Sequence, residues 1–178
     1  MLVVQRWSSV SLPAALQWQA VGFMRTAWPS IDGGALREPY PASLHPTYYA
    51  VADTDLLLSM AATFQTQVSV GTQPLTAICL GNVFTFPAAR HRGYARQVVE
   101  AASADLRRSS ADLGALLCDP DLESLYAAAG WQPAPDSATI TATGETIDAL
   151  RMMLPLSSTA AAAHHHLTNE PLRVPTAW

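Results

Sequence analysis

The middle of the chain reads Phe84-Thr85-Phe86-Pro87-Ala88-Ala89-Arg90-His91-Arg92-Gly93-Tyr94-Ala95-Arg96. An apolar strand candidate ends in this stretch and a helix candidate begins, with an arginine-rich turn between them. Apolar residues recur at helical spacing in Gly93 to Arg108, which predicts a helix with one buried face. The first N–H groups of such a helix lack intrahelical partners, and its dipole adds partial positive charge. We therefore expect a phosphate group to bind at Arg90 to Arg96, where Gly93 allows close approach of the backbone.

Three strand candidates precede this stretch and form a predicted antiparallel meander. They cover Tyr48 to Ala52, about Leu57 to Val70, and Leu75 to Phe86. Turn residues stand between them, at Asp53 to Asp55 and at Gly71-Thr72, where hairpins need them. A helix is expected before the meander, from Ser11 to Trp28.

The sequence after the central helix predicts a buried strand and a second, shorter helix. Leu113 to Cys118 is a short apolar run typical of a buried, parallel-type strand. Asp119 is a good N-cap with Pro120 at the first helical position, and this helix runs through Tyr126 and is closed by Gly130. Two further strands are expected at Ala138 to Thr143 and Ala149 to Leu156.

Length and composition predict one domain. The chain has 178 residues, of which 49% are hydrophobic, enough for a substantial core. We expect the folded domain to cover residues 1–156. Residues 157–178 are Ala-rich and then polar, which predicts a tail or docking extension. The run His164 to His166 is interpreted as a feature of this tail rather than as a metal site.

Charge and residue types exclude several functions. The formal net charge is −4, which argues against nucleic acid as a partner. All ten basic residues are arginine, so mechanisms that need a lysine are excluded. Cys79 and Cys118 are too few for a disulfide framework or a zinc site, and we expect reduced thiols and no metal. No stretch is apolar enough for a membrane span or a secretory signal, which predicts a soluble, cytoplasmic protein.

Two motifs resemble those of the GNAT superfamily of N-acetyltransferases. Arg90 to Ala95 is similar to the family's phosphate-loop signature R/Q-x-x-G-x-G/A, and it also follows a strand and opens a helix. Leu125-Tyr126-Ala127-Ala128-Ala129-Gly130-Trp131 is similar to the family's L-Y-x-x-x-G-F/W segment. The resemblance implies an α/β fold with a central, mostly antiparallel sheet, a parallel splayed strand pair and flanking helices. It also implies acetyl-CoA as co-substrate.

The resemblance assigns roles to particular residues. The expected coenzyme-binding residues are Phe84, Thr85, Phe86, Arg90, His91, Arg92, Gly93, Tyr94, Ala95 and Arg96. The first three would pair with pantetheine like an added strand, and a backbone N–H near Phe84 would polarise the thioester carbonyl. Tyr126 is the expected general acid, because a phenol of pKa about 10 can protonate a departing thiolate of pKa about 8.5. Attack by the amine would be direct, without an acyl-enzyme.

The general base is left open by the sequence. Relatives frequently carry a glutamate on the strand before the phosphate loop, whereas Leu80-Gly81-Asn82-Val83 has no carboxylate here. A water chain, Asp119, Glu38 or His45 could serve, or the acceptor could arrive deprotonated. Cys118 is not favoured as a nucleophile, because no histidine is spaced to pair with it.

The acceptor is expected to be a small amine bound by the loop from Trp28 to Tyr49. The resemblance covers about Tyr48 to Leu156 and looks nearest to the subgroup of aminoglycoside 2'-N-acetyltransferases, although the strand carboxylate of that subgroup is missing. The alternative is a coenzyme A-binding module that regulates without turnover. Edge strands near the C-terminus also allow a homodimer.

Overall fold

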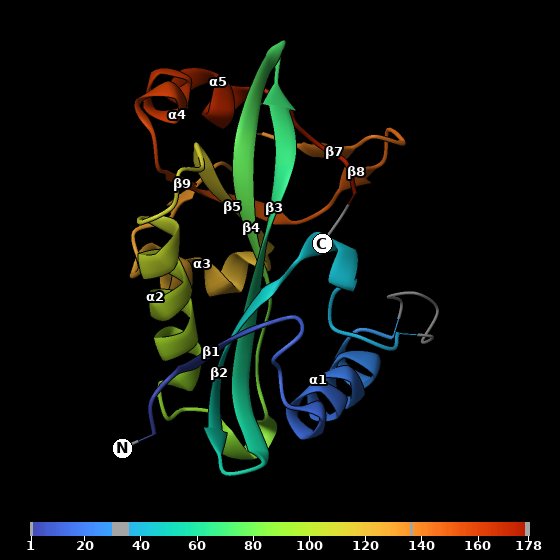
Figure 1. Ribbon diagram of the computed structural model, residues 1–178. Helices are drawn as coiled ribbons and strands as arrows, with labels where there is room; N and C mark the ends of the chain where they lie inside the picture. The colour runs from blue at the N-terminus through green and yellow to red at the C-terminus, as the bar shows by residue number, and fades with distance from the viewer. Residues whose placement is uncertain (1, 30–35, 136, 177–178) are drawn as a thin grey trace. The chain divides into compact units, whose positions relative to one another are not determined.

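The computed structural model describes residues 2–29, 36–135 and 137–176 (Figure 1). The chain divides into two compact units. The first unit comprises Met1–Phe64 and Asn82–Ala102, and the second unit comprises Gln65–Gly81 and Ser103–Trp178. Strands β3 (Leu56–Val70) and β4 (Gln73–Thr85) and helix α2 (Tyr94–Leu106) each contribute residues to both units.

The first unit contains an antiparallel ladder of β1 (Gln5–Ser8), β2 (Thr47–Asp53) and the first part of β3. Helix α1 (Ala14–Ala27) begins directly after Pro13 and buries a stripe at helical spacing that includes Leu16, Ala20 and Met24. The side chain of Gln19 fixes α1 to the β2–β3 hairpin. Its Oε1 accepts from the Leu57 N–H at 3.0 Å, and its Nε2 donates to the Asp55 carbonyl at 2.6 Å.

The second unit contains the mixed part of the sheet, in the strand order β6-β9-β5-β4-β3-β10-β7-β8. β5 (Leu113–Cys118) runs parallel to β4 and antiparallel to β9 (Leu150–Pro155). The last parallel pair joins Leu80 and Leu116, while β4 continues to Thr85 and β5 to Cys118. The predicted α/β fold with a parallel strand pair in a mixed sheet is therefore confirmed.

The remaining elements are short. They are η2 (Ala42–Leu44), η3 (Pro87–Ala89), η4 (Pro120–Leu122), α3 (Glu123–Ala127), β6 (Gln132–Pro133), β7 (Thr139–Thr141) and β8 (Thr146–Ile147). Throughout the described part of the chain, no helix combines the length and the apolar character needed to cross a membrane.

The C-terminal residues are folded, where the sequence analysis expected a tail or docking extension after Leu156. They form α4 (Ser158–Ala162), α5 (His164–Asn169) and β10 (Leu172–Val174), and β10 pairs with both β3 and β7. Ala160, Ala163 and Leu167 form a buried helical stripe. The helical stripe is hard to recognise in the sequence, because alanines surround it and give no clear contrast between apolar and polar positions. A three-residue strand is likewise too short to show a pattern of alternating buried and exposed residues.

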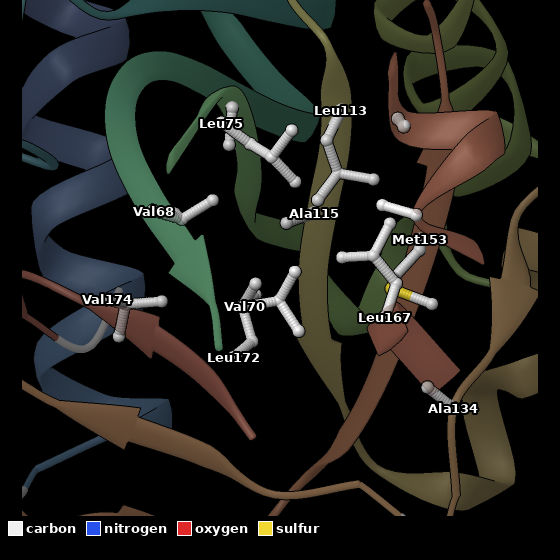
Figure 2. Packing of buried hydrophobic residues seen from close by; sticks show 13 residues of the cluster. Val68, Val70, Leu75, Leu113, Ala115, Ala134, Met153, Leu167, Leu172 and Val174 are labelled. Carbon is white, nitrogen blue, oxygen red and sulfur yellow. The ribbon is translucent and has the colours of Figure 1, made fainter. Parts of the chain in front are cut away.

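These C-terminal residues complete the hydrophobic core of the second unit (Figure 2). Leu172 lies directly across from Val70 in the sheet register. Leu167 packs in the same cluster as Ala115 and Met153. The first and the last segments of the second unit therefore pack in one core. β10 joins β3 to β7 in the sheet of this unit.

Arg151 connects the C-terminal helix to the sheet of the second unit. It lies on β9 and is only 1% exposed. Its Nη1 donates to the Ala138 carbonyl at 2.8 Å, and its Nη2 donates to Ser137 Oγ and the Leu167 carbonyl. Among the described residues no carboxylate side chain pairs with it, and burial lowers its pKa to about 10. Backbone carbonyls and the Ser137 hydroxyl thus accept hydrogen bonds from this buried guanidinium.

We expect Arg151→Leu to lower the free energy of unfolding by about 3 kcal/mol, because it removes the guanidinium from the Leu167 carbonyl and from buried Ser137, while the Ala138 carbonyl keeps only the Leu172 N–H. Arg173→Leu is the matched control, since Arg173 is an exposed arginine on strand β10 of the same unit and should change stability by no more than about 0.5 kcal/mol. Urea unfolding followed by circular dichroism measures both. Equal losses in the two variants would contradict this role for Arg151.

Candidate functional site

A tight turn joins the end of β4 to α2 in the first unit. The Phe86 N–H still bonds to the Leu58 carbonyl at 2.9 Å, and η3 then carries the chain to Arg90. His91 and Gly93 both have positive φ, of 62° and 78°. Two left-handed residues in three positions reverse the chain sharply, so α2 begins at Tyr94 with no preceding turn of helix.

This turn leaves a row of backbone donors open. Within the described residues, the N–H groups of His91 to Arg96 donate to no acceptor, and the first bond into the helix runs from Gln97 N–H to the Gly93 carbonyl at 3.1 Å. A Cβ built on Gly93 would meet nothing within 4 Å. The turn therefore offers the converging donors and the unobstructed approach that a phosphate group needs.

Arginine side chains surround the turn. Arg90 is exposed, and its Nε donates to the Thr85 carbonyl at 3.3 Å. Arg96 pairs with Glu100 at 2.7 Å, and this hydrogen bond raises the pKa of Arg96. In the part of the chain that the structure describes, the exposed Arg92 forms neither an ion pair nor a side-chain hydrogen bond. Arg92 is thus the guanidinium most available to an added anion.

The backbone groups of Phe84, Thr85 and Phe86 at the end of β4 do not all face the same edge of the strand. The buried hydroxyl of Ser59 donates to the Phe84 carbonyl at 2.8 Å and lies 2.9 Å from Thr85 Oγ1. Phe84 and Phe86 thus both direct backbone groups toward β3. Because these directions alternate along a strand, Thr85 directs its own toward the opposite edge. Of the three strand residues expected to pair with a ligand, Thr85 is the best placed.

Asn82 is a residue of the first unit that the sequence analysis missed. It has φ of 50°, which kinks β4 before the ligand-binding candidates. Its Nδ2 donates to the Pro39 carbonyl at 2.8 Å, which ties the segment between α1 and β2 to β4. Asparagine tolerates the left-handed conformation better than most residues, and the residue type was the one signal in the sequence for an irregular backbone at this position. Asp32 and the Gly33-Gly34 pair of the expected acceptor loop lie outside the described residues.

Four aromatic rings meet around the end of β4. Phe23 and Phe84 are stacked with ring centroids 4.3 Å apart and an interplanar angle of 12°. Trp28 and Phe86 contact this pair edge-on, at centroid distances from 5.1 to 6.4 Å. Phe84 is buried, whereas the other three rings remain partly exposed. These four residues are called the aromatic cluster below.

Tyr126 lies in α3 of the second unit. The side chain is buried, with 4% exposure. Burial is the main cause that raises the pKa of its phenol, and the nearby thiol of Cys118 is the second cause. Burial, together with Asp119 and Glu123, also raises the pKa of Cys118 to about 11. Cys118 therefore stays a neutral thiol at neutral pH, which argues against a nucleophilic role.

Gly130 and Trp131 fix the segment that carries Tyr126. Gly130 has φ of 90°, and a Cβ there would lie 2.5 Å from Arg107 Nη2, which donates to the Ala129 carbonyl. The indole N–H of Trp131 donates to Ser103 Oγ at 2.8 Å, and both residues are buried. The glycine and tryptophan of the motif thus hold the end of α3 against the end of α2 within the second unit.

The candidate bases differ in their surroundings. Asp119 caps η4 by accepting from the Asp121 N–H at 3.0 Å. His45 is exposed and has φ of 48°. Glu38 is partly buried, and its charge helps to raise the pKa of Tyr48. Over residues 2–29, 36–135 and 137–176, no three His, Cys, Asp or Glu side chains gather to hold a metal ion.

The two units divide the expected site residues between them. All ten coenzyme-binding candidates, from Phe84 to Arg96, belong to the first unit, whereas Tyr126 belongs to the second. The first unit thus brings together the open donors, the arginines and the aromatic cluster. The second unit supplies a buried, protonated phenol.

Comparison with known proteins points to one family. The family model described as "Acetyltransferase (GNAT) domain" matches residues 10–134. Among curated proteins, none matches the chain significantly.

Solved structures share the fold. An aminoglycoside 6'-N-acetyltransferase complexed with coenzyme A is 12% identical, with a TM-score of 0.64 over 88% of this chain and 98% of that one. A GNAT family N-acetyltransferase from Escherichia coli in complex with CoA is 16% identical, with a TM-score of 0.58 over 97% of this chain and 90% of that one. A probable N-acyltransferase from Enterococcus faecalis is 15% identical, with a TM-score of 0.53 over 75% of this chain. The chain spans only 33% of that last protein's length.

We expect Gly130→Ala to destabilise the protein more than Gly144→Ala does. Both glycines have positive φ, at 90° and 85°, so both variants carry the conformational cost of about 1 kcal/mol. Only at Gly130 does the new Cβ displace Arg107 from the Ala129 carbonyl, because a Cβ at Gly144 meets nothing within 4 Å. The difference in unfolding free energy should be about 1.5 kcal/mol. Equal destabilisation in urea would show that the arginine contact contributes nothing.

Proposed function

Because the chain belongs to the GNAT acetyltransferase family, we propose that it transfers the acetyl group of acetyl-CoA to the nitrogen of a small amine. The observation that carries the proposal is the turn from His91 to Gly93, with its open N–H groups and the clear space at Gly93. A turn of this kind fits a diphosphate, and the diphosphate of the coenzyme carries two negative charges.

The first unit supplies the groups that would hold the coenzyme. The N–H groups of His91 to Arg96 fit the diphosphate, and Arg92 and Arg90 would neutralise its charge. The Thr85 backbone would pair with the pantetheine arm. Acetyl-CoA supplies the activated acetyl group when it is bound. The residues of this chain bind it, orient it and handle the proton that the departing sulfur needs.

Tyr126 is the proposed general acid. In the transfer, the amine nitrogen forms a bond to the acetyl carbon, the carbon–sulfur bond breaks, and the sulfur takes a proton from the phenol. The proton that the nitrogen releases passes to water, and a proton from water restores the phenol. The raised pKa keeps that proton on Tyr126 at neutral pH.

The amine is proposed to lose its proton to water. Asp119 is engaged as a cap and His45 is exposed in a loop, so neither is favoured as a base. A water-assisted step needs a neutral amine, and its rate therefore rises with pH as the amine deprotonates.

The finer expectations from the sequence stay predictions. They are a homodimer, a cytoplasmic location, independence of metal ions and the resemblance to 2'-N-acetyltransferases. The aminoglycoside enzyme among the structural neighbours is named for the 6' position instead.

We expect Gly93→Ala to weaken coenzyme A binding at least ten-fold, because the new methyl group would occupy the approach to the open N–H groups. Gly144→Ala is the matched control, since it also places a Cβ at positive φ in open space. Both variants should lose similar stability, and only Gly93→Ala should lose affinity in titration calorimetry. Unchanged affinity in Gly93→Ala would remove the main support for the diphosphate site.

We expect Tyr126→Phe to lower kcat by about 10²- to 10⁴-fold, because the departing sulfur loses its proton donor. The affinity for coenzyme A should stay within about two-fold. Cys118→Ala should retain most of the activity, since attack is direct. Thiol release from acetyl-CoA in the presence of an amine panel measures all three proteins.

The pH profile gives a second readout of Tyr126. Because its pKa is raised, the phenol remains protonated, and kcat/KM should show no descending limb below about pH 10. A descending limb near pH 8 would be inconsistent with a buried phenol as the acid. Saturable coenzyme binding without thiol release for any amine would refute the proposed transfer and favour a binding module.

A further inference from the structure

The aromatic cluster surrounds the strand residue that is best placed to meet the coenzyme. Phe84 and Phe86 flank Thr85 in sequence. Phe23 of α1 contacts both rings, and Trp28, the C-cap residue of α1, contacts Phe84. The cluster differs from the aliphatic core of the second unit, which is buried throughout. Three of the four rings keep exposed surface, so the cluster still has apolar area that a ligand can cover.

The segment that follows α1 is held in place within the same unit. Asn82 binds the Pro39 carbonyl at 2.8 Å, two residues before Phe84. A hydrogen bond from the Tyr40 backbone reaches Tyr48, and burial raises the pKa of Tyr48 to about 12. These contacts fix the backbone of residues 36–46 relative to β4, and they place Glu38 close enough to Tyr48 to affect its titration.

One carboxylate belongs to the described part of this segment. Glu38 is the single acidic residue of residues 36–46, and Asp32 lies outside the described residues. Glu100 is paired with Arg96, and Asp53 and Asp55 lie at the β2–β3 hairpin. A ligand with several positive charges needs several carboxylates, whereas one ammonium group is satisfied by one carboxylate and by aromatic faces.

From these observations we infer that the acceptor is an amine carrying a flat apolar group, such as an arylalkylamine. The inference rests on the proposed function and names the substrate class of the same site. Phe23, Trp28 and Phe86 act as specificity-determining residues that cover the apolar group.

The test compares binding with turnover in the full-length protein. Titration calorimetry on protein saturated with coenzyme A measures the affinity for 2-phenylethylamine, ethylamine, spermidine and kanamycin. Thiol release from acetyl-CoA measures kcat/KM for the same four amines. We expect 2-phenylethylamine to bind at least ten-fold more tightly than the other three and to show the highest kcat/KM.

Variants on α1 identify the surface responsible. Trp28→Leu and Phe23→Leu keep apolar volume but remove the rings, and each should lower the ratio of kcat/KM for 2-phenylethylamine over ethylamine by about five- to ten-fold. Trp18→Leu is the matched control, because Trp18 lies on the same helix, is 58% exposed and belongs to no ring contact of the aromatic cluster. It should leave the ratio unchanged. A purely structural role would lower both substrates equally and leave the ratio intact in every variant.

The possible outcomes separate the inference from the proposed function. Preferred binding of 2-phenylethylamine without turnover of any amine would support the inference about the site and refute the transfer. Turnover in which kanamycin or spermidine exceeds 2-phenylethylamine would uphold the transfer and overturn the inference. Equal affinities for 2-phenylethylamine and ethylamine would also overturn it.

Discussion

The candidate site depends on one backbone constraint, the pair of left-handed residues His91 and Gly93 between β4 and α2. A chain that enters a helix gradually can satisfy its first N–H groups with a capping side chain or a preceding turn. Here the reversal is too sharp for either, and the donors of His91 to Arg96 stay open in the described structure. Glycine makes this possible at Gly93, since a Cβ would cost conformational energy and obstruct the approach.

Local signals in the sequence predict much of this fold. The strand Leu113–Cys118 was predicted with its observed bounds, because a short apolar run between polar residues has few other interpretations. The hairpin at Gly71 and the start of the central helix were also predicted, since each depends on residues adjacent in the chain. The C-terminal helices and β10 were missed. Their signal is a stripe of Ala160, Ala163 and Leu167 that becomes meaningful only against the sheet.

In the candidate site, too, features that depend on adjacent residues were predicted and features that depend on distant residues were not. The open turn and the glycine–tryptophan pair after Tyr126 follow from motifs that are contiguous in sequence. Asn82, the aromatic cluster and Arg151 do not, because each acts through partners distant along the chain. Phe23 and Phe84 are separated by most of the meander, and nothing in either local sequence indicates that they stack. Long-range contacts of this kind carry the proposed acceptor specificity, whereas the local motifs indicate the family.

The position of β10 has a consequence for the order in which the protein assembles during synthesis. β10 lies between β3 and β7 in the sheet, although it is the last strand to be made. Until Leu172 to Val174 have left the ribosome, β7 and β8 have no place to dock and the β3 edge near Val70 stays open. The sheet of the second unit is therefore completed only once Leu172 to Val174 have emerged, and until then the open β3 edge is available for pairing with other strands.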